Sequence, residues 1–327
     1  MRTAPASCPL RGHNRQRILL NNDGGKYPAE KYANLKHYLS VCAIFRNEAE
    51  YLREWIEFHG LNGVGHFYLY NNQSDDDYLP VLKDYVDRGT VTLRDWPERW
   101  AGSTQRNVYG ECIERDGKDS RWIAFIDLDE FLFAPNAENL PAVLREYEGF
   151  PGIVVNWQIY GSSGLKKKPD GLVIENYTMK AGTGWIGNKS VKSIVDPAKA
   201  LRPISPHVFA YRDGEPAVTE NFEPVRIVRT GRIIRSLKRR ITAILPRFPV
   251  DPYTSYLCDI KGVSVNKLRI NHYLVKSEEE ALDDLKRHNH NRKVSLIDKM
   301  KYYDRNDEKD DILLRCVPEL KKRLSAV

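Results

Sequence analysis

The feature that most constrains the fold is an alternation of apolar runs with helix-like segments between residues 38 and 126. Runs rich in apolar residues, typical of strands buried on both faces, occur at residues 39–45, 65–70, 91–93 and 122–126. Segments with apolar residues at helical spacing separate them. Alternating strands and helices predict an α/β fold, in which a mostly parallel sheet has helices on both faces.

Three helices are predicted between these strands, over residues 52–59, 79–86 and 104–115. Gly60 and Gly89 follow the first two, as expected where helices end. After residue 150 the alternation becomes less regular. Short apolar runs at residues 153–157 and 172–174 predict two further strands there.

Polar residues follow several of the predicted strands directly. They lie at residues 46–48, 71–77 and 127–130, and at Asp95. The carboxyl ends of parallel strands share one edge of a sheet, and ligands bind in the crevice beyond that edge. The sequence therefore predicts a binding site at this edge.

The remaining chain divides by composition. Residues 1–36 mix proline, glycine and basic residues, and predict an irregular arm. Residues 37–292 are interpreted as one domain and residues 293–327 as a charged helical tail. Residues 225–247 hold no acidic side chain and concentrate the net charge of +7. That segment fits a solvated helix face, an anionic membrane surface or an acidic polysaccharide.

Composition indicates a folded chain, because 41% of its 327 residues are hydrophobic and 29% are charged. The five cysteines are odd in number and widely spaced, which favours a reducing compartment. Neither a signal peptide nor an apolar run of membrane-spanning length is present. We therefore expect a cytoplasmic protein, either free or peripheral at the inner face of the membrane.

Asp127 and Asp129 are the clearest chemical signal. They stand two residues apart, directly after the apolar run 122–126 and before the apolar run 131–133. Carboxylates placed like this suit Mg²⁺ or Mn²⁺, whereas a helix cap or a pair of solvated loop acids is the alternative for so short a motif. The apolar flanks favour the metal, because unpaired acids beside a core would be costly.

Several motifs together resemble nucleotide-sugar glycosyltransferases of the bacterial family-2-like and family-92-like kinds. They follow one another in the family's order over roughly residues 38–292. The motifs are Cys42–Glu48, Trp55–His59, Phe67–Ser74, Trp122–Phe131, Gly161–Gly164, Lys192–Val195 and Ile270–Tyr273. This resemblance implies a GT-A (Rossmann-like) fold, a nucleoside-diphosphate-sugar donor, Mn²⁺ or Mg²⁺, and inversion at the anomeric carbon.

The resemblance also implies metal ligands. Asp127 and Asp129 match the family's metal-binding acids. His272 matches a histidine that completes metal or diphosphate binding. Taken alone, a histidine between apolar strand residues would instead be read as a hydrogen-bonded structural residue.

Donor contacts follow by the same analogy. The positions where the nucleoside is held are Asn47, Glu48, Asn72 and Asp75. Lys192 would face the diphosphate, although a single lysine is more often a solvated surface charge.

Inverting transfer also needs a general base for the acceptor hydroxyl. The candidates are Glu130, His207 and Asp196, which the sequence does not rank. Glu130 fits equally well as a strand-end acid satisfied by the backbone or by an arginine.

We therefore expect a metal-dependent, inverting, hexosyltransferase-like enzyme. It would move a sugar from a nucleotide donor, such as a uridine diphosphate sugar, to a glycan or lipid-linked acceptor. A nucleotidyltransferase with the same paired acids is one alternative, and it would release pyrophosphate. A nucleic-acid-binding module is disfavoured, because the aromatic residues do not cluster with the basic ones.

A carbohydrate-binding pseudoenzyme is the other alternative. Trp157 and Tyr160 precede the small-residue loop 161–164, and these aromatic rings are expected to stack on a sugar in an acceptor site. The small residues would let that sugar approach closely. Such a protein would show no metal-dependent donor binding.

Overall fold

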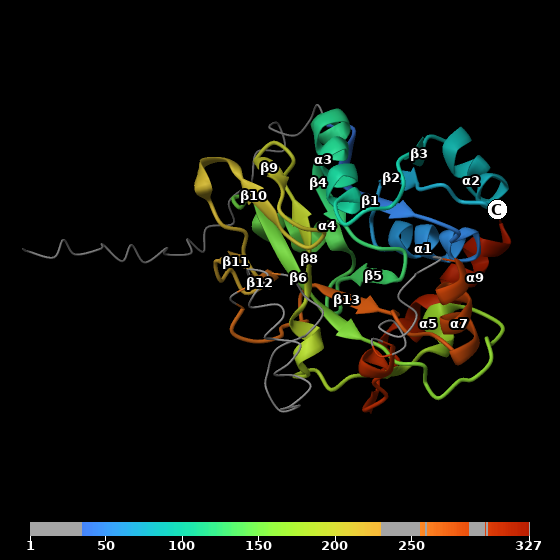
Figure 1. Cartoon of the computed structure of the whole chain (residues 1–327). Helices are drawn as coiled ribbons and strands as arrows, with labels where there is room; N and C mark the ends of the chain where they lie inside the picture. The colour runs from blue at the N-terminus through green and yellow to red at the C-terminus, as the bar shows by residue number, and fades with distance from the viewer. Residues whose placement is uncertain (1–34, 230–255, 259, 288–297, 299, 327) are drawn as a thin grey trace, which may run out of the picture. The chain divides into compact units, whose positions relative to one another are not determined.

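Eight strands form one sheet in the computed structural model, which describes residues 35–229, 256–258, 260–287, 298 and 300–326. The strand order is β3-β2-β1-β4-β8-β6-β13-β5 (Figure 1). The strands are β1 (His37–Phe45), β2 (His66–Asn71), β3 (Val91–Asp95), β4 (Ser120–Phe125), β5 (Glu130–Phe133), β6 (Gly152–Ile159), β8 (Val191–Val195) and β13 (Arg269–His272).

The sheet is mostly parallel. β1 pairs in parallel with β2 and with β4, β2 with β3, and β6 with β13. β8 runs antiparallel to both of its neighbours, β4 and β6, and β5 runs antiparallel to β13. Two successive antiparallel pairings restore the original direction, so β6 points the same way as β4. The predicted α/β class with a mostly parallel sheet is confirmed.

Helices cover both faces of this sheet. Successive side chains of a strand point to opposite faces, and β1 shows the consequence. Val41 lies in the same core as Trp55 of α1, whereas Cys42 lies in a second core with Val108 of α3. Figure 1 shows α1 and α3 on opposite sides of the sheet. The prediction that helices cover both faces of the sheet is confirmed as well.

Helices α1, α2 and α3 correspond to the three predicted helices, and the structure holds others besides. They are α1 (Ala49–Leu61), α2 (Tyr78–Asp87), α3 (Thr104–Asp116), α4 (Leu140–Leu144), α5 (Val173–Asn176), α7 (Glu278–Arg287) and α9 (Val317–Ser325). A contact from a distant loop caps α1, because Asp76 Oδ2 accepts a hydrogen bond from Ala49 N at 2.8 Å. The predicted strand at residues 172–174 is wrong, since this run begins helix α5.

Among the described residues, three small sheets accompany the main one, each with two antiparallel strands. They pair β9 (Ala200–Pro203) with β10 (Phe209–Tyr211), β11 (Ile227–Arg229) with β12 (Tyr256–Cys258), and β7 (Met179–Lys180) with β14 (Glu308–Lys309). The pairing of β14 with β7 links the C-terminal segment to the middle of the chain.

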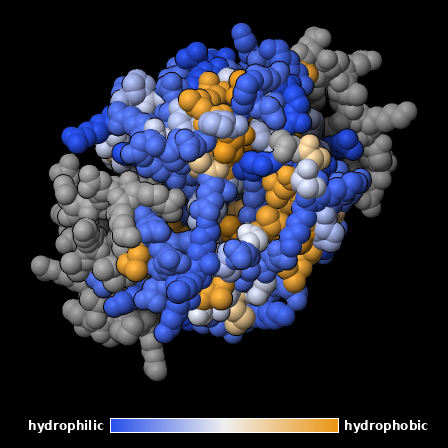
Figure 2. All heavy atoms as spheres, turned by 90° about the vertical axis from the view of Figure 1, so that its right-hand side faces the viewer, coloured by the Kyte–Doolittle hydropathy of each residue, from blue (hydrophilic) through white to orange (hydrophobic). Residues whose placement is uncertain are grey.

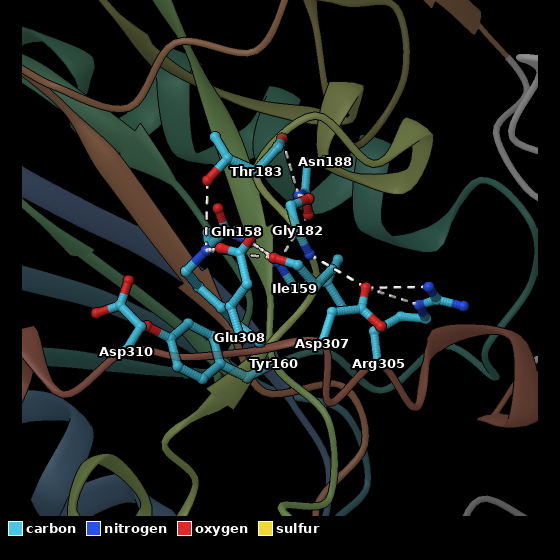
Figure 3. A network of polar contacts seen from close by, with 12 residues as sticks. Gln158, Ile159, Tyr160, Gly182, Thr183, Asn188, Arg305, Asp307, Glu308 and Asp310 are labelled. Atoms are coloured by element: carbon cyan, nitrogen blue, oxygen red, sulfur yellow. Dashed lines mark hydrogen bonds and ion pairs between the residues drawn. The ribbon is translucent and has the colours of Figure 1, made fainter.

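Residues 300–326 pack on the same core as the main sheet. Tyr303, Leu313 and Leu320 are buried within it. A polar network also ties this segment to residues beside β6, and Asp307 Oδ2 accepts a hydrogen bond from Gly182 N at 3.2 Å (Figure 3). The segment is therefore part of the folded body that carries the sheet.

The small-residue loop 161–164 packs against this C-terminal segment. Asp304 Oδ1 accepts a hydrogen bond from Ser162 N at 2.7 Å, and a Cβ added at Gly161 would lie 2.5 Å from the carbonyl oxygen of Arg305. Protein therefore occupies the space beside Gly161 and Ser162, where we expected a sugar, whereas Gly164 is exposed. Tyr160 is buried too, and its hydroxyl lies 2.7 Å from Arg269 of β13. The expected stacking role of Tyr160 is wrong.

Parts of three predicted segments lie outside the described residues. These are residues 1–34 of the N-terminal arm, residues 230–247 of the basic segment, and residues 293–297, 299 and 327 of the helical tail. Within the described ranges, no helix combines the length and the apolar character needed to cross a membrane.

The face turned to the viewer in Figure 2 is largely hydrophilic, with separate hydrophobic areas. Large apolar side chains exposed among the described residues are Leu79, Val86, Trp100, Leu201, Leu282 and Leu314. They belong to several different elements, and scattered apolar residues of this kind are normal on a protein surface.

Candidate active site

The turn between β4 and β5 gathers three carboxylates at the carboxyl edge of the parallel strands. Asp127 and Asp129 lie in this turn, and Glu130 begins β5. Strand β13 places His272 directly opposite Glu130. As a result His272 Nε2 lies 3.2 Å from Asp129 Oδ2, although the two residues are 143 positions apart in the chain.

Asp129, Glu130 and His272 could hold a metal ion together, because each offers a ligand atom and these atoms lie within 4.8 Å of one another. Glu130 Oε1 and His272 Nδ1 are buried and have no hydrogen-bond partner among the described residues. Buried polar atoms rarely stay unpaired, which is consistent with a missing ligand. Two carboxylates and an imidazole suit a divalent ion such as Mn²⁺, so these residues fit one.

Asp127 has different neighbours from Asp129. Its Oδ2 lies 2.7 Å from Lys192 Nζ, and its Oδ1 accepts a hydrogen bond from Gln105 Nε2. The hydroxyl of Tyr109 lies 3.4 Å from the same Oδ1. Of the three residues predicted to hold a metal, the structure brings Asp129 and His272 together, while both carboxylate oxygens of Asp127 contact protein groups and its side chain is 34% exposed.

Lys192 is almost completely buried, with 1% of its side chain exposed. Its Nζ also lies 3.7 Å from Glu130 Oε2. Burial alone would lower the pKa of Lys192, but the carboxylates of Asp127 and Glu130 raise it above its ordinary value. The lysine is therefore a buried cation inside the acid cluster and not a solvated surface charge.

Burial and charge move the pKa values of two acids apart. Burial raises the pKa of Glu130 well above its ordinary value, with Lys192 acting in the opposite direction. Burial would also raise the pKa of Asp129, but His272 and the nearby lysines lower it below its ordinary value. Glu130 is thus the acid that most needs a cation to stay ionised.

Side chains that the sequence did not assign to the site hold this turn in place. Trp55 Nε1 of α1 donates to the carbonyl oxygen of Glu130 at 2.8 Å and to that of Asp127 at 3.2 Å. Gln105 and Tyr109 reach Asp127 from α3. A signal for Gln105 was present, because it lies in the first turn of a helix that follows a strand end.

Trp157 of β6 lies against two histidines. Its ring centre is 4.3 Å from that of His272 and 5.4 Å from that of His207. Trp157 is buried, and its Nε1 has no hydrogen-bond partner among the residues that the structure describes. Packing on the two imidazoles replaces the open stacking surface that we expected for this residue.

His207 is partly exposed and uses one ring nitrogen internally. Its Nδ1 lies 2.9 Å from the carbonyl oxygen of Val191. Because a carbonyl only accepts, Nδ1 carries the proton and Nε2 is the basic nitrogen. Burial, together with the charge of Lys192, lowers the pKa of His207 to about 4. The side chain is therefore neutral at neutral pH, and Nε2 offers a lone pair.

Asp196 is separated from this group. β8 runs antiparallel to β4, so Lys192 near its start lies at the carboxyl edge of β4, while Asp196 follows its end at the opposite edge. There Asp196 Oδ2 pairs with Arg121 NH1 at 3.0 Å. Its assignment as a candidate base is corrected to a structural ion pair.

The predicted nucleoside-binding residues follow the ends of β1 and β2. Asn47 Oδ1 accepts a hydrogen bond from Asp75 N at 2.8 Å, and the fully buried Asn72 donates from Nδ2 to the carbonyl oxygen of Trp96 at 3.0 Å. Both asparagines thus brace loops. The Asp75 side chain is exposed and Glu48 is partly exposed. Contact of these residues with a nucleoside stays a prediction.

Comparison with known proteins gives several relatives. A rice protein, Glycosyltransferase family 92 protein Os08g0121900 of Oryza sativa subsp. japonica, is 37% identical over 171 residues, which are 51% of this chain and 28% of that protein. Galactan beta-1,4-galactosyltransferase GALS3 of Arabidopsis thaliana is 31% identical over 106 residues, covering 30% of this chain and 21% of that protein. The chain therefore spans less than a third of either relative.

Solved structures give weaker similarities. S. aureus TarS in complex with UDP aligns at a TM-score of 0.34 and 13% identity, covering 49% of this chain and 47% of that one. Glucosyl-3-phosphoglycerate synthase from Mycobacterium tuberculosis aligns at a TM-score of 0.26 and 14% identity, covering 38% of this chain and 44% of that one. The family assignment rests on the sequence match instead.

The model of Glycosyltransferase family 92 matches residues 36–223. This match includes Asp127, Asp129, Glu130 and Lys192, and it ends before His272. Because it covers more than half of the sequence, the chain belongs to glycosyltransferase family 92.

Proposed function

We propose that this chain is a metal-dependent glycosyltransferase that moves a sugar from a nucleoside-diphosphate sugar to a hydroxyl of a glycan or lipid-linked acceptor, with inversion. The observation that carries the proposal is the convergence of Asp129, Glu130 and His272 at the carboxyl edge of the parallel strands. Family membership supports the reaction class. Relatives named as β-1,4-galactosyltransferases make UDP-galactose the first donor to test.

Asp129, Glu130 and His272 would hold a Mn²⁺ or Mg²⁺ ion. When bound, the ion would stabilise the negative charge that grows on the departing diphosphate. Trp55 keeps the acidic turn fixed through its two hydrogen bonds to backbone carbonyls. Trp157 packs edge-on against His272 and limits the rotation of that ring.

His207 is the proposed general base. It lies beside Trp157 and is partly exposed, whereas Glu130 is fully buried and contacts Lys192. As the acceptor oxygen bonds to the anomeric carbon, its proton would pass to His207 Nε2 and the bond to the diphosphate would break. The hydrogen bond from Nδ1 to Val191 keeps the tautomer that leaves Nε2 free to accept.

The test is product analysis with UDP-galactose and other nucleotide sugars, in the presence of Mn²⁺ and a panel of glycan acceptors. Release of a nucleoside diphosphate with formation of a glycosylated product is the expected result. Asp129→Asn should lower the rate by about 100-fold or more in a protein that is still folded at the assay temperature, because a metal ligand is lost. Pyrophosphate release would indicate a nucleotidyltransferase, and failure of every nucleotide sugar to bind with Mn²⁺ would indicate a pseudoenzyme.

A further inference from the structure

The proposed reaction does not explain why a buried lysine, Lys192, lies among the carboxylates of the proposed metal site. The side chain is 1% exposed, and its Nζ contacts Asp127 at 2.7 Å and Glu130 at 3.7 Å. A buried ammonium group is costly unless it is paired. The lysine is therefore a built part of the acid cluster.

Asp127 is bound to protein on both carboxylate oxygens. Lys192 contacts Oδ2, while Gln105 donates to Oδ1 and the Tyr109 hydroxyl lies 3.4 Å from it. The group of described residues whose ligand atoms lie within 4.8 Å of one another contains Asp129 but not Asp127. The two aspartates of the motif thus have different surroundings, although they stand two residues apart.

A count of the charges in the cluster gives a physical reason for the different surroundings of the two aspartates. Asp129 and Glu130 would bind a metal as carboxylates, and Asp127 pairs with Lys192 as a carboxylate, so the three acids together carry three negative charges. Lys192 reduces this sum to two, which one divalent cation balances. Without the lysine the cluster would hold one uncompensated negative charge beside the metal.

We propose that Asp127 is not a metal ligand but a positioning residue that holds Lys192, and that Lys192 matches the charge of the site to a single divalent ion. This inference rests on the proposed function, because it concerns the ion that would assist departure of the diphosphate. It divides the motif into a metal half, Asp129 with Glu130 and His272, and a lysine half, Asp127 with Gln105 and Tyr109.

Direct measurement of Mn²⁺ affinity by calorimetry tests this division. Asp129→Asn should weaken binding by about 100-fold, because it removes a ligand, while Asp127→Asn should weaken it by about tenfold through charge alone. Lys192→Met should tighten binding by about tenfold, because a repelling charge is removed. Lys189→Met, at an exposed position of the same segment, is the matched control and should leave the affinity unchanged.

The decisive variant combines Asp127→Asn with Lys192→Met. It keeps the net charge of the cluster and removes both members of the Asp127–Lys192 ion pair together, so neither of them is left without the other. Glu130 loses its contact with Lys192 in both Lys192→Met and the double variant, so the comparison of these two variants isolates the effect of Asp127. We expect its Mn²⁺ affinity to return to within about threefold of the parent protein. Affinity as weak as that of Asp129→Asn would show that Asp127 is a ligand and would overturn the inference.

The proposed function can fail separately. A parent protein that does not bind Mn²⁺ at all would contradict metal dependence itself. A parent protein that binds Mn²⁺ and transfers sugar, together with a double variant that is not restored, would contradict only the division of the motif. Lys192→Arg keeps the charge and should bind Mn²⁺ as the parent does, and a large loss there would also contradict the charge-matching role.

Discussion

His59 provides a sharp test of how α1 supports the acidic turn. This fully buried side chain lies between α1 and β5, which is the last strand of the sheet. Its Nδ1 lies 2.8 Å from the carbonyl oxygen of Trp55, and its Nε2 accepts a hydrogen bond from Leu132 N at 3.0 Å. Both ring nitrogens are therefore used by the neutral tautomer, and a protonated ring would direct an N–H against the N–H of Leu132.

The size of the expected change in the free energy of unfolding follows from the pKa of His59. Burial lowers the pKa of His59 from 6.5 to about 3 in the folded protein, with the hydrogen bond to Trp55 acting in the opposite direction. The contribution of His59 to the free energy of unfolding is complete above pH 6.5. It is lost as the pH falls from 6.5 toward 3, because the unfolded chain then binds a proton that the folded chain does not. At about pH 5 the loss is about 2 kcal/mol, taking 1.4 kcal/mol for each pH unit below 6.5.

The assay is urea unfolding of the parent protein and of His59→Gln at about pH 7.5 and about pH 5. Glutamine offers a donor and an acceptor but carries no titratable proton. His59→Gln should be the less stable protein at the higher pH, and its deficit should shrink by about 2 kcal/mol at the lower pH. Other buried histidines titrate equally in both proteins, so the difference between their free energies of unfolding depends on His59 alone. A deficit that is independent of pH would refute the reasoning.

Two further predictions concern packing around the site. Trp55→Phe removes the indole N–H that Glu130 O accepts at 2.8 Å, and it should lower the free energy of unfolding by about 1–3 kcal/mol in urea titrations, with no loss contradicting a bracing role. Gly161→Ala would place a Cβ 2.5 Å from the carbonyl oxygen of Arg305, so it should cost about 1–3 kcal/mol by the same measurement. Gly149→Ala, where a Cβ meets nothing within 4 Å, is its control, and equal effects of the two would refute the steric argument.

Local pattern was enough to predict much of the sheet and its first helices. The apolar runs at residues 39–45 and 122–126 correspond to β1 (His37–Phe45) and β4 (Ser120–Phe125), and residues 104–115 form most of α3. Periodicity and strand length are short-range properties that neighbouring residues determine. These three predicted elements therefore agree with the structure to within about two residues at their ends.

The run at residues 172–174 shows where local pattern fails. Three apolar residues are compatible with a strand, yet they begin helix α5. The carboxylate of Glu54, on α1, accepts hydrogen bonds from Val173 N at 2.8 Å and Ile174 N at 3.1 Å. A helix start is favoured by partners for its free N–H groups, and here that partner comes from a distant part of the chain.

The sequence by itself determined the alternation of strands and helices, the edge of the sheet where the acids gather, and the family to which the chain belongs. Only the tertiary structure decided which polar groups meet there. The direction of β8 brings Lys192 to the acids and takes Asp196 to the opposite edge, and the pairing of β13 with β5 brings His272 beside Asp129. Strand direction and partner choice depend on contacts between residues far apart in the chain, and a local pattern of residues carries no record of them.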